Sequence, residues 1–370
     1  MRRPLAHLGI SFVSVCATLL FLEVGIRIVH PQDLEYWDSR SFRRIKSTSP
    51  HFVENIPNTS ANFLGVPVRI NRLGLREDEI ATPKPLHTLR VVVVGDSVTF
   101  GYGIPVENTY AKLLEKRLNE QSSDGMRYEV LNGGTLGGSL ADYLHFLTMK
   151  AELLQPDIVI VGLNLNDVFV YSESGNISED GAEWQGARQP RLHRFSEFLL
   201  RHSHLYMFCY TRLKLSLYAL GVLDMNKLQG SNFAALAPPS AYQAEAWEST
   251  LGMLSRIAAF CWEHGYRLVV VVFPMQMQMS PAELKFYREK YRLQLGDGAL
   301  TGEPQRRLRE FAAATCMSLL DLLPVYRTYN SQDLYLRNNM IRSDPNHPSV
   351  KGNQVAADEI FRVLRNFIRD

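Results

Sequence analysis

Three residue types that together perform acyl-transfer chemistry stand at separate points of the sequence: a serine, Ser97, an aspartate, Asp344, and a histidine, His347. A serine hydroxyl is a weak nucleophile by itself and needs a general base, usually a histidine oriented by a carboxylate. Asp344 and His347 are three residues apart in the loop of residues 343–348, where two prolines restrict the backbone. Both side chains can therefore point the same way, although an Asp-x-x-His pair taken alone is more often a surface turn.

Such a nucleophile also requires hydrogen-bond donors for the oxyanion that forms on the substrate carbonyl. The glycine-rich run of residues 132–139, which includes Gly134 and Gly137, can leave backbone N–H groups open to a ligand. A glycine-rich loop before a helix can instead hold phosphate, but this one lacks the lysine of a P-loop and fits no dinucleotide fingerprint. Asn166 offers an uncharged amide donor; its alternative interpretation is an ordinary turn at a strand end.

The segment around Ser97 indicates how the chain positions these groups. Four consecutive valines, residues 91–94, predict a strand buried on both faces, which Gly95 ends just before Asp96 and Ser97. In an open α/β sheet, ligands bind outside the carboxyl ends of the strands. A serine at this place is either a nucleophile or a helix cap. The residues at the ends of the other strands indicate which of the two roles applies.

From residue 88 onwards, apolar strands alternate with helices. We expect strands at residues 90–94, 128–131, 158–162, 267–273 and 318–322. We expect helices at about residues 109–121, 140–154, 244–264, 281–293, 303–315 and 349–368. This alternation predicts a doubly wound, three-layer α/β/α fold with a parallel sheet of about five strands. The candidate residues follow the first, second, third and last strands, so they can converge on one crevice.

In this order, the residues resemble the four motif blocks of the SGNH (GDSL-like) hydrolase superfamily, named for its Ser, Gly, Asn and His. The blocks are Gly95-Asp96-Ser97, the run from Asn132 to Gly137, Asn166-Asp167 and Asp344-x-x-His347. The resemblance covers residues 88–368 apart from 171–243. It implies a flavodoxin-like hydrolase fold in which Ser97 is the nucleophile, His347 the general base and Asp344 its orienting carboxylate, with Asp96 supporting the loop.

The resemblance also implies an oxyanion hole made of the Ser97 and Gly137 N–H groups and the Asn166 side chain, with Gly134 as a second candidate for the glycine. The family's third block usually reads Gly-x-Asn-Asp, but Asn164 stands at the glycine position here. The sequence lacks the Gly-x-Ser-x-Gly motif of an α/β-hydrolase. Neither a metal nor an organic cofactor is implied.

The N-terminal sequence indicates that the chain is targeted to a membrane. Arg2 and Arg3 precede an apolar run from Leu8 to Val29, which contains Glu23 and Arg27 near its end and whose first fifteen residues, Leu8 to Leu22, carry no charge. A signal-peptide core needs roughly 7–15 apolar residues and a membrane span roughly 20, so the segment lies between the two. We interpret residues 1–30 as a signal anchor rather than a cleaved signal, with the arginines in the cytoplasm. Residues 31–87 are expected to form a linker and an ordered extension, and residues 88–370 an extracytoplasmic (periplasmic or extracellular) hydrolase domain with a helical insertion at about 171–243.

Two segments leave alternatives open. The insertion contains a helical stretch, Arg194–Leu217, whose broad apolar face fits a helix packed on the core or a wall over the site about equally. A membrane-lying helix is the third interpretation and fits less well. The basic cluster Arg40, Arg43, Arg44 and Lys46 fits a solvated loop better than a site for anionic headgroups.

The amino-acid composition excludes some classes of function. The 370 residues are 46% hydrophobic, as in a globular protein, and the net charge of +2 argues against nucleic-acid binding. The four cysteines lack C-x-x-C spacing, which excludes a disulfide framework or a structural zinc site. We predict a membrane-anchored serine esterase that removes an acetyl or other acyl group, from a small molecule or from a cell-envelope glycan or lipid. The alternatives are an O-acyltransferase acting on a polysaccharide and a non-catalytic glycan-binding protein; the oligomeric state stays open.

Overall fold

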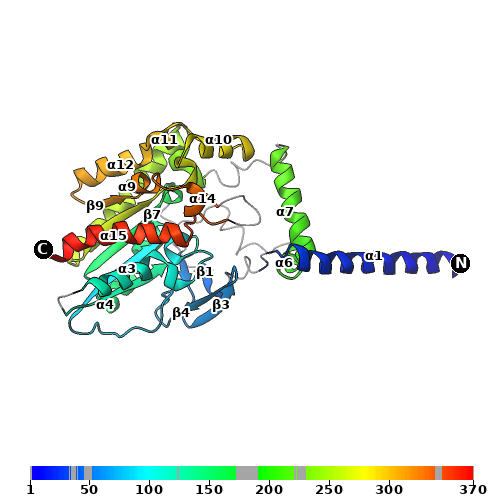
Figure 1. Cartoon of the computed structure of the whole chain (residues 1–370), viewed down its shortest axis with the longest axis horizontal. Coiled ribbons are helices and arrows are strands. Elements are labelled where there is room, and N and C mark those ends of the chain that lie inside the picture. Colours follow the sequence, from blue (N-terminus) through cyan, green and yellow to red (C-terminus); the bar gives the residue numbers. More distant parts are fainter. Residues whose placement is uncertain are drawn as a thin grey trace.

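A five-stranded parallel sheet in the order β6-β5-β7-β8-β9 forms the centre of the computed structural model (Figure 1). The structure describes residues 2–32, 34, 39, 41–45, 52–122, 125–171, 191–220, 222, 231–337 and 344–369. The strands are Thr88–Gly95 (β5), Arg127–Gly134 (β6), Ile158–Asn164 (β7), Arg267–Phe273 (β8) and Ser318–Asp321 (β9). The predicted parallel sheet is therefore confirmed, with β6 and β7 running further toward the site than the sequence pattern indicates.

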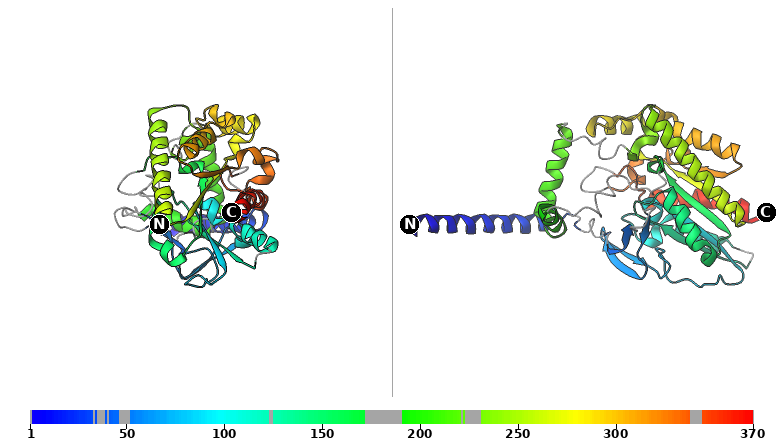
Figure 2. Two further views of the ribbon diagram at one scale, coloured as in Figure 1. Left: turned by 90° about the vertical axis from the view of Figure 1, so that its left-hand side faces the viewer. Right: turned by 180° about the vertical axis from the view of Figure 1, so that it is seen from behind.

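Helices cover both faces of this sheet (Figures 1 and 2). One face carries α3 (Tyr110–Gln121) and α15 (Val350–Arg369), and the other carries α4 (Leu140–Leu154) and α9 (Ala241–Glu263). The valines of β5 serve both layers, because successive side chains of a strand point to opposite faces. Val91 and Val93 pack with α3 and α15, whereas Val92 and Val94 pack with α4 and α9. The predicted three-layer α/β/α fold is confirmed.

The order of the strands creates a switch point beside β5. From β5 the chain passes to β6 on one side and afterwards to β7 on the other. At such a point the connections leave in opposite directions, and a crevice opens at the carboxyl ends of the strands. Ser97 begins a one-turn helix, α2 (Ser97–Phe100), immediately after β5 and thus stands at this switch point.

The remaining helices follow β8 or β9 in the chain. They are α10 (Pro281–Lys290), α11 (Gly298–Thr301), α12 (Glu303–Ala314), α13 (Leu323–Tyr326) and α14 (Ser331–Leu334). Short 3₁₀ turns add η2 (Val106–Asn108), η3 (Leu165–Asp167), η4 (Ser231–Leu236) and η5 (Gln276–Gln278). Of these, η4 packs beside η3, so the last part of the insertion lies next to the turn that carries Asn166.

Before β5, the chain forms two small antiparallel sheets. β1 (Arg43–Ile45) pairs with β2 (Val53–Asn55), and β3 (Thr59–Phe63) pairs with β4 (Val66–Ile70). Their apolar side chains form a cluster with Phe100 of α2 and with Leu136 of the glycine-rich run. The N-terminal extension is thus packed against the segment that follows Ser97.

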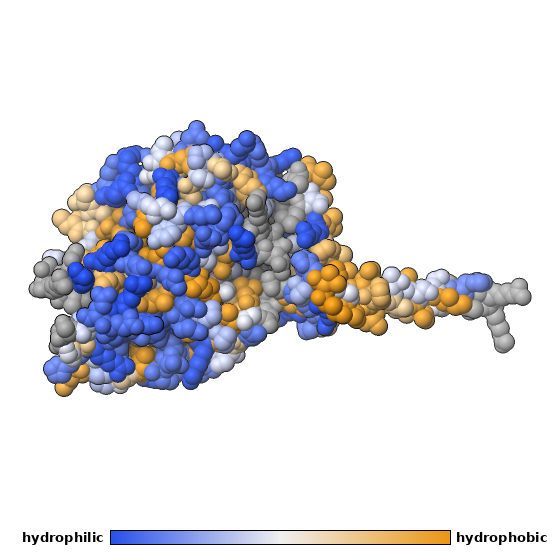
Figure 3. Space-filling view, in the orientation of Figure 1, coloured by the Kyte–Doolittle hydropathy of each residue, from blue (hydrophilic) through white to orange (hydrophobic). Residues whose placement is uncertain are grey.

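The N-terminal helix α1 (Arg2–Val29) projects away from this body (Figure 1). Its segment Gly9–Val29 has 21 residues, a mean hydropathy of 2.1 and no residue buried within the protein, and apolar side chains cover it (Figure 3). By length and composition it could cross a membrane, a test that a signal sequence also passes.

The helical stretch of the insertion is two helices, α6 (Arg191–His202) and α7 (His204–Ala219). They contact each other, α7 also contacts α1, and α7 runs across the direction of α1 (Figures 1 and 2). These helices therefore lie where α1 meets the body. Residues 172–190, 221 and 223–230 of the insertion lie outside the described residues.

Candidate active site

Ser97 and His347, 250 residues apart in the chain, are in hydrogen-bond contact. The Ser97 Oγ lies 2.7 Å from the His347 Nε2, and the His347 Nδ1 lies 2.8 Å from the Asp344 Oδ2. The Asp344 carboxylate can only accept, so it selects the tautomer with the proton on Nδ1. The His347 Nε2 is then an acceptor for the Ser97 hydroxyl proton, which is the relation a general base requires.

The loop before α15 holds Asp344 and His347 in place. The Asp344 Oδ1 accepts hydrogen bonds from the backbone N–H groups of Asn346 (2.9 Å) and His347 (3.1 Å). The His347 carbonyl accepts from the Leu336 N–H at 2.9 Å. These bonds fix the carboxylate relative to the imidazole before any substrate arrives.

The electrostatics of the pair favour a charged imidazole. Burial lowers the pKa of His347, but the charge of Asp344, its hydrogen bond and the charge of Asp96 together hold that pKa above its usual value. Burial raises the pKa of Asp344, and the charge and hydrogen bonds of His347 outweigh this, so that the carboxyl pKa lies below its usual value. Asp344 is therefore an anion at neutral pH, and its charge favours the protonated form of the His347 imidazole.

Asp96 joins the Ser97 turn to the turn that carries Asn166. Its Oδ1 accepts from the Val98 N–H at 2.8 Å as the N-cap of α2, and its Oδ2 accepts from the Asn166 Nδ2 at 3.2 Å. Because Asp96 accepts, it turns the NH₂ of Asn166 rather than its oxygen toward the Ser97 turn. An amide NH₂ carries two hydrogens, so Asn166 keeps one for another acceptor.

The backbone N–H groups of Ser97 and Gly137 remain available as donors in the described part of the chain. The Ser97 N–H opens α2, where an N–H has no acceptor within the helix. The Gly137 N–H likewise has no acceptor in the described part of the chain, whereas the Gly134 N–H donates to the Asn132 Oδ1 at 3.0 Å. Of the two candidate glycines, Gly137 is the one with an N–H open to a ligand.

Three side chains contact the candidate site although the sequence does not predict them as site residues. Tyr102 stacks on the ring of His347, with ring centroids 4.0 Å apart. The buried guanidinium of Arg76 donates to the carbonyls of Phe100, Gly101 and Ile104, and so ties down the segment after α2. Arg43 donates to the Leu136 carbonyl at 2.9 Å.

Arg43 belongs to the basic cluster expected to lie in a solvated loop, and this expectation is wrong for Arg43. Its side chain is half-buried against the glycine-rich run, because its Nη1 binds the Leu136 carbonyl there. Its neighbour Arg44 is exposed and pairs with Glu54 at 2.6 Å. Arg40 and Lys46 lie outside the described residues. No signal short of the three-dimensional pairing distinguishes Arg43 from the others.

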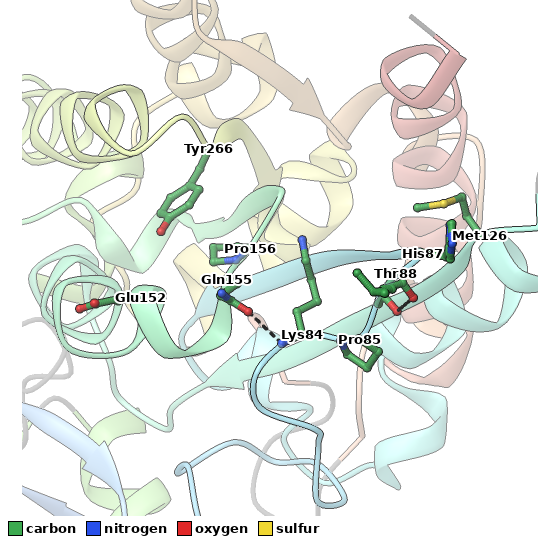
Figure 4. A pocket seen from close by; sticks show the side chains of 10 residues that line it. Lys84, Pro85, His87, Thr88, Met126, Glu152, Gln155, Pro156 and Tyr266 are labelled. Carbon is green, nitrogen blue, oxygen red and sulfur yellow. Dashed lines mark hydrogen bonds between the residues drawn. The ribbon is translucent and has the colours of Figure 1, made fainter.

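A depression of about 680 Å³ lies elsewhere, at the amino end of β5 (Figure 4). It is lined by Lys84, Thr88, Gln155 and Tyr266, among others, and by none of the predicted site residues. The Lys84 ammonium is paired with Asp157 at 2.6 Å. The Lys84 backbone N–H donates to the Gln155 Oε1 at 2.8 Å (Figure 4). Parallel α/β sheets bind ligands at the opposite, carboxyl end of the strands, where Ser97 lies.

Comparison with known proteins gives esterases and lipases. No family model matches the chain. An arylesterase of Vibrio mimicus is 32% identical over 78 residues, which are 21% of this chain and 38% of the arylesterase, so this chain spans less than two fifths of that relative. The acetyl xylan esterase AlAXEase is 15% identical, with a TM-score of 0.42 over 74% of this chain and 99% of its own. A GDSL-like lipase from Bacteroides thetaiotaomicron is 12% identical, with a TM-score of 0.38 over 78% of this chain and 92% of its own.

Proposed function

We propose that this chain is a serine esterase that hydrolyses a carboxylic ester. The contact that carries the proposal is the 2.7 Å approach of the Ser97 Oγ to the His347 Nε2, continued by the 2.8 Å contact of the imidazole with Asp344. A serine used only as a helix cap needs no such base. Asp96, not Ser97, accepts the capping hydrogen bond of α2, which supports a chemical role for Ser97.

In the acylation step, the Ser97 Oγ attacks the ester carbonyl carbon while its proton passes to the His347 Nε2. The carbonyl oxygen becomes an oxyanion that accepts hydrogen bonds from the Ser97 and Gly137 N–H groups and the Asn166 Nδ2. The tetrahedral intermediate collapses, the C–O bond to the alcohol breaks, and His347 returns its proton to the leaving oxygen. An acyl group is left on Ser97.

In the deacylation step, water attacks the acyl carbon, His347 accepts the water proton, and a second oxyanion forms at the same donors. Collapse breaks the acyl–Oγ bond, His347 returns the proton to Ser97, and the carboxylic acid leaves. Asp344 stays ionised throughout and stabilises the imidazolium. No redox partner takes part, because water is the only co-reactant.

The test uses the full-length protein in detergent. Wild type is expected to hydrolyse 4-nitrophenyl acetate and to be labelled on Ser97 by a fluorophosphonate. The Ser97→Ala variant is expected to lose both properties and to keep its circular dichroism spectrum. Full activity in that variant, or a wild type that neither hydrolyses aryl esters nor takes the label, overturns the proposal.

For the substrate, we propose an acetyl or other acyl ester of a cell-envelope glycan or lipid, since an anchored enzyme meets such esters at the membrane. Transfer of the acyl group to a sugar hydroxyl in place of water uses the same residues. Product analysis with and without a glycan acceptor separates the two reactions. Release of free carboxylate that does not depend on the acceptor, with no acylated glycan, indicates hydrolysis; acylated glycan indicates transfer.

We also propose that α1 is retained as a membrane anchor. Its last turns are bonded to the α6–α7 junction: Glu23 accepts hydrogen bonds from the Ser203 hydroxyl and the N–H groups of His204 and Leu205. Arg27 pairs with Glu23 at 2.7 Å and donates to the His202 carbonyl at 3.0 Å. A cleaved signal peptide would take Glu23 away and leave the first N–H groups of α7 without this acceptor.

Two measurements test the anchor and its direction. Intact mass of the protein extracted from membranes is expected to include residues 1–30; a mature form that begins beyond residue 30 overturns the proposal. Cys316 is exposed on the catalytic body. We expect a membrane-impermeant maleimide to label it in intact cells with a permeable outer layer, with Cys316→Ser as the control. Labelling only after lysis places the body in the cytoplasm and refutes the proposed direction.

A further inference from the structure

Among the side chains of the N-terminal extension that contact the glycine-rich run, Arg43 is the one that binds the peptide unit of Gly137 in the described part of the chain. It lies on β1, and its Nη1 donates to the Leu136 carbonyl at 2.9 Å. The preceding residue, Phe42, is fully buried and stacks on Phe100 of α2, with ring centroids 5.5 Å apart. The start of β1 is thus fastened to the Ser97 turn and to the glycine-rich run at the same time.

The geometry of a peptide unit makes the Arg43 contact consequential. In a planar trans peptide, the C=O and the N–H point in opposite directions. The Leu136 carbonyl and the Gly137 N–H belong to one peptide unit. An arginine that holds the carbonyl on one side therefore turns the N–H to the other side and keeps it there.

The Arg43 side chain also packs against the backbone of Gly137. Its φ of +66° lies in the left-handed region, which glycine adopts without the usual steric cost. A Cβ at this position would lie 3.0 Å from the Arg43 Nη1, so the guanidinium packs directly against the Gly137 backbone. A flexible glycine loop alone samples several peptide orientations; a bond to its carbonyl and a group packed on its α-carbon restrict it to one.

We propose that Arg43 is a positioning residue for the oxyanion hole: it orients the Leu136–Gly137 peptide so that the Gly137 N–H donates to the oxyanion. The inference rests on the esterase function proposed above and extends the active site to the N-terminal extension. The positive charge on the carbonyl side also polarises the peptide and makes its N–H a stronger donor. Since the oxyanion carries full charge only near the transition state, the effect falls on the rate more than on substrate binding.

The chain offers a matched control in Arg44. It is the next residue of the same strand, it is also a surface-reaching arginine, and its ion pair with Glu54 links β1 to β2. Replacing Arg44 removes a charge and a contact of β1 without touching the glycine-rich run. Any loss that comes only from loosening this small sheet must therefore appear in Arg44→Met as well.

The experiment compares Arg43→Met, Arg43→Lys and Arg44→Met in the full-length protein, with 4-nitrophenyl acetate as substrate and phenethyl trifluoromethyl ketone as inhibitor. Ser97 adds to the ketone and creates a stable oxyanion. We expect Arg43→Met to lower kcat about 10- to 100-fold, with KM changed less than about twofold and the ketone Ki raised in proportion. Arg43→Lys keeps a charge and a donor on a shorter side chain, so its kcat is expected to lie between those of wild type and Arg43→Met. The kcat of Arg44→Met is expected to match that of wild type.

Three outcomes would each overturn the role of Arg43. Arg43→Met and Arg44→Met could lose kcat equally, or Arg43→Met could change KM alone, or the ketone Ki could stay constant while kcat falls. If Arg43→Met fails to fold, the same comparison of kcat with Ki is made on Arg43→Lys. An inactive wild type that takes no fluorophosphonate label refutes the esterase function instead. Failure of the two proposals is thus distinguishable.

Discussion

The ring of Tyr102 stacks on the ring of His347, with centroids 4.0 Å apart and planes inclined by 16°. Tyr102 also donates its backbone N–H to the Ser97 carbonyl at 3.0 Å, so the stacking residue belongs to the same turn as the serine. Phe63 of the N-terminal extension also meets Tyr102 edge to face. The candidate base is therefore held by Asp344 and by Tyr102 of the serine turn, and Tyr102 in turn contacts the extension.

The stack predicts a split between two Tyr102 variants. The face of an aromatic ring attracts a cation, so Tyr102 stabilises the imidazolium that forms as His347 takes the Ser97 proton. We expect Tyr102→Phe to keep kcat within about twofold and Tyr102→Ala to lower it roughly 5- to 10-fold, since a stack of this kind contributes about 1 kcal/mol. Steady-state kinetics on an aryl acetate measures both. Equal losses in the two variants would assign the effect to the hydroxyl and contradict the stacking argument.

The pH dependence of hydrolysis follows from the raised pKa of His347. His347 acts as a base only when neutral, so kcat/KM is expected to rise with pH through a pKa above the usual value of about 6.5. Asp344→Asn removes the charge that raises this pKa. The acidic limb should then move to lower pH, while kcat falls by about 10²–10⁴-fold because the imidazole loses its tautomer and orientation. A limb that stays in place in Asp344→Asn would show that Asp344 does not set the titration of His347.

Much of the fold is predictable because its signals are local. The valines of residues 91–94 and the apolar run 267–273 are long enough to identify buried strands, and the structure places β5 and β8 there. Helix α4 spans the predicted residues 140–154. Ser97, Asp344 and His347 could be singled out because each stands at a strand end or in a constrained loop, in an order typical of one superfamily.

The residues that sequence reasoning missed act through contacts without a local pattern. Arg43 meets Leu136 across 93 positions, and Tyr102 meets His347 across a still longer separation. Arginines in an irregular segment look alike in sequence, and only the pairing of β1 with β2 separates the half-buried Arg43 from the exposed Arg44. The packing partner of the insertion is not predictable for the same reason, because an apolar helix face does not show which element it packs against. In the structure, α7 contacts α1.

Asn166 is expected to act only in the transition state. Its Nδ2 is held by Asp96 at 3.2 Å and keeps one hydrogen for an oxyanion. Asn166→Ala should lower kcat about 10²- to 10³-fold and leave KM nearly unchanged. Asn166→Asp should lower it further, because a carboxylate there repels both Asp96 and the oxyanion. Activity of Asn166→Ala within twofold of wild type would remove this side chain from the oxyanion hole.

Alanine at the two candidate glycines should separate structural from catalytic roles. A Cβ on Gly134 would lie 2.2 Å from the Phe100 N and 2.6 Å from the Thr99 carbonyl carbon, both backbone atoms of α2. Gly134→Ala must therefore displace the serine turn, and we expect it to lower the melting temperature strongly, as overpacking costs about 1–3 kcal/mol or more.

Gly137→Ala should instead keep the fold and lose activity. Its Cβ would meet only the end of the Arg43 side chain, at 3.0 Å, and the left-handed backbone costs about 1–2 kcal/mol. We expect kcat about 10-fold lower, because the methyl group shifts the peptide that carries the donor. Gly65→Ala is the matched control: it has a φ of +75° and open space for a Cβ, so it carries a similar strain away from the site. Gly65→Ala should lose comparable stability and no activity; a matching loss of kcat in both variants would attribute the Gly137 effect to backbone strain alone.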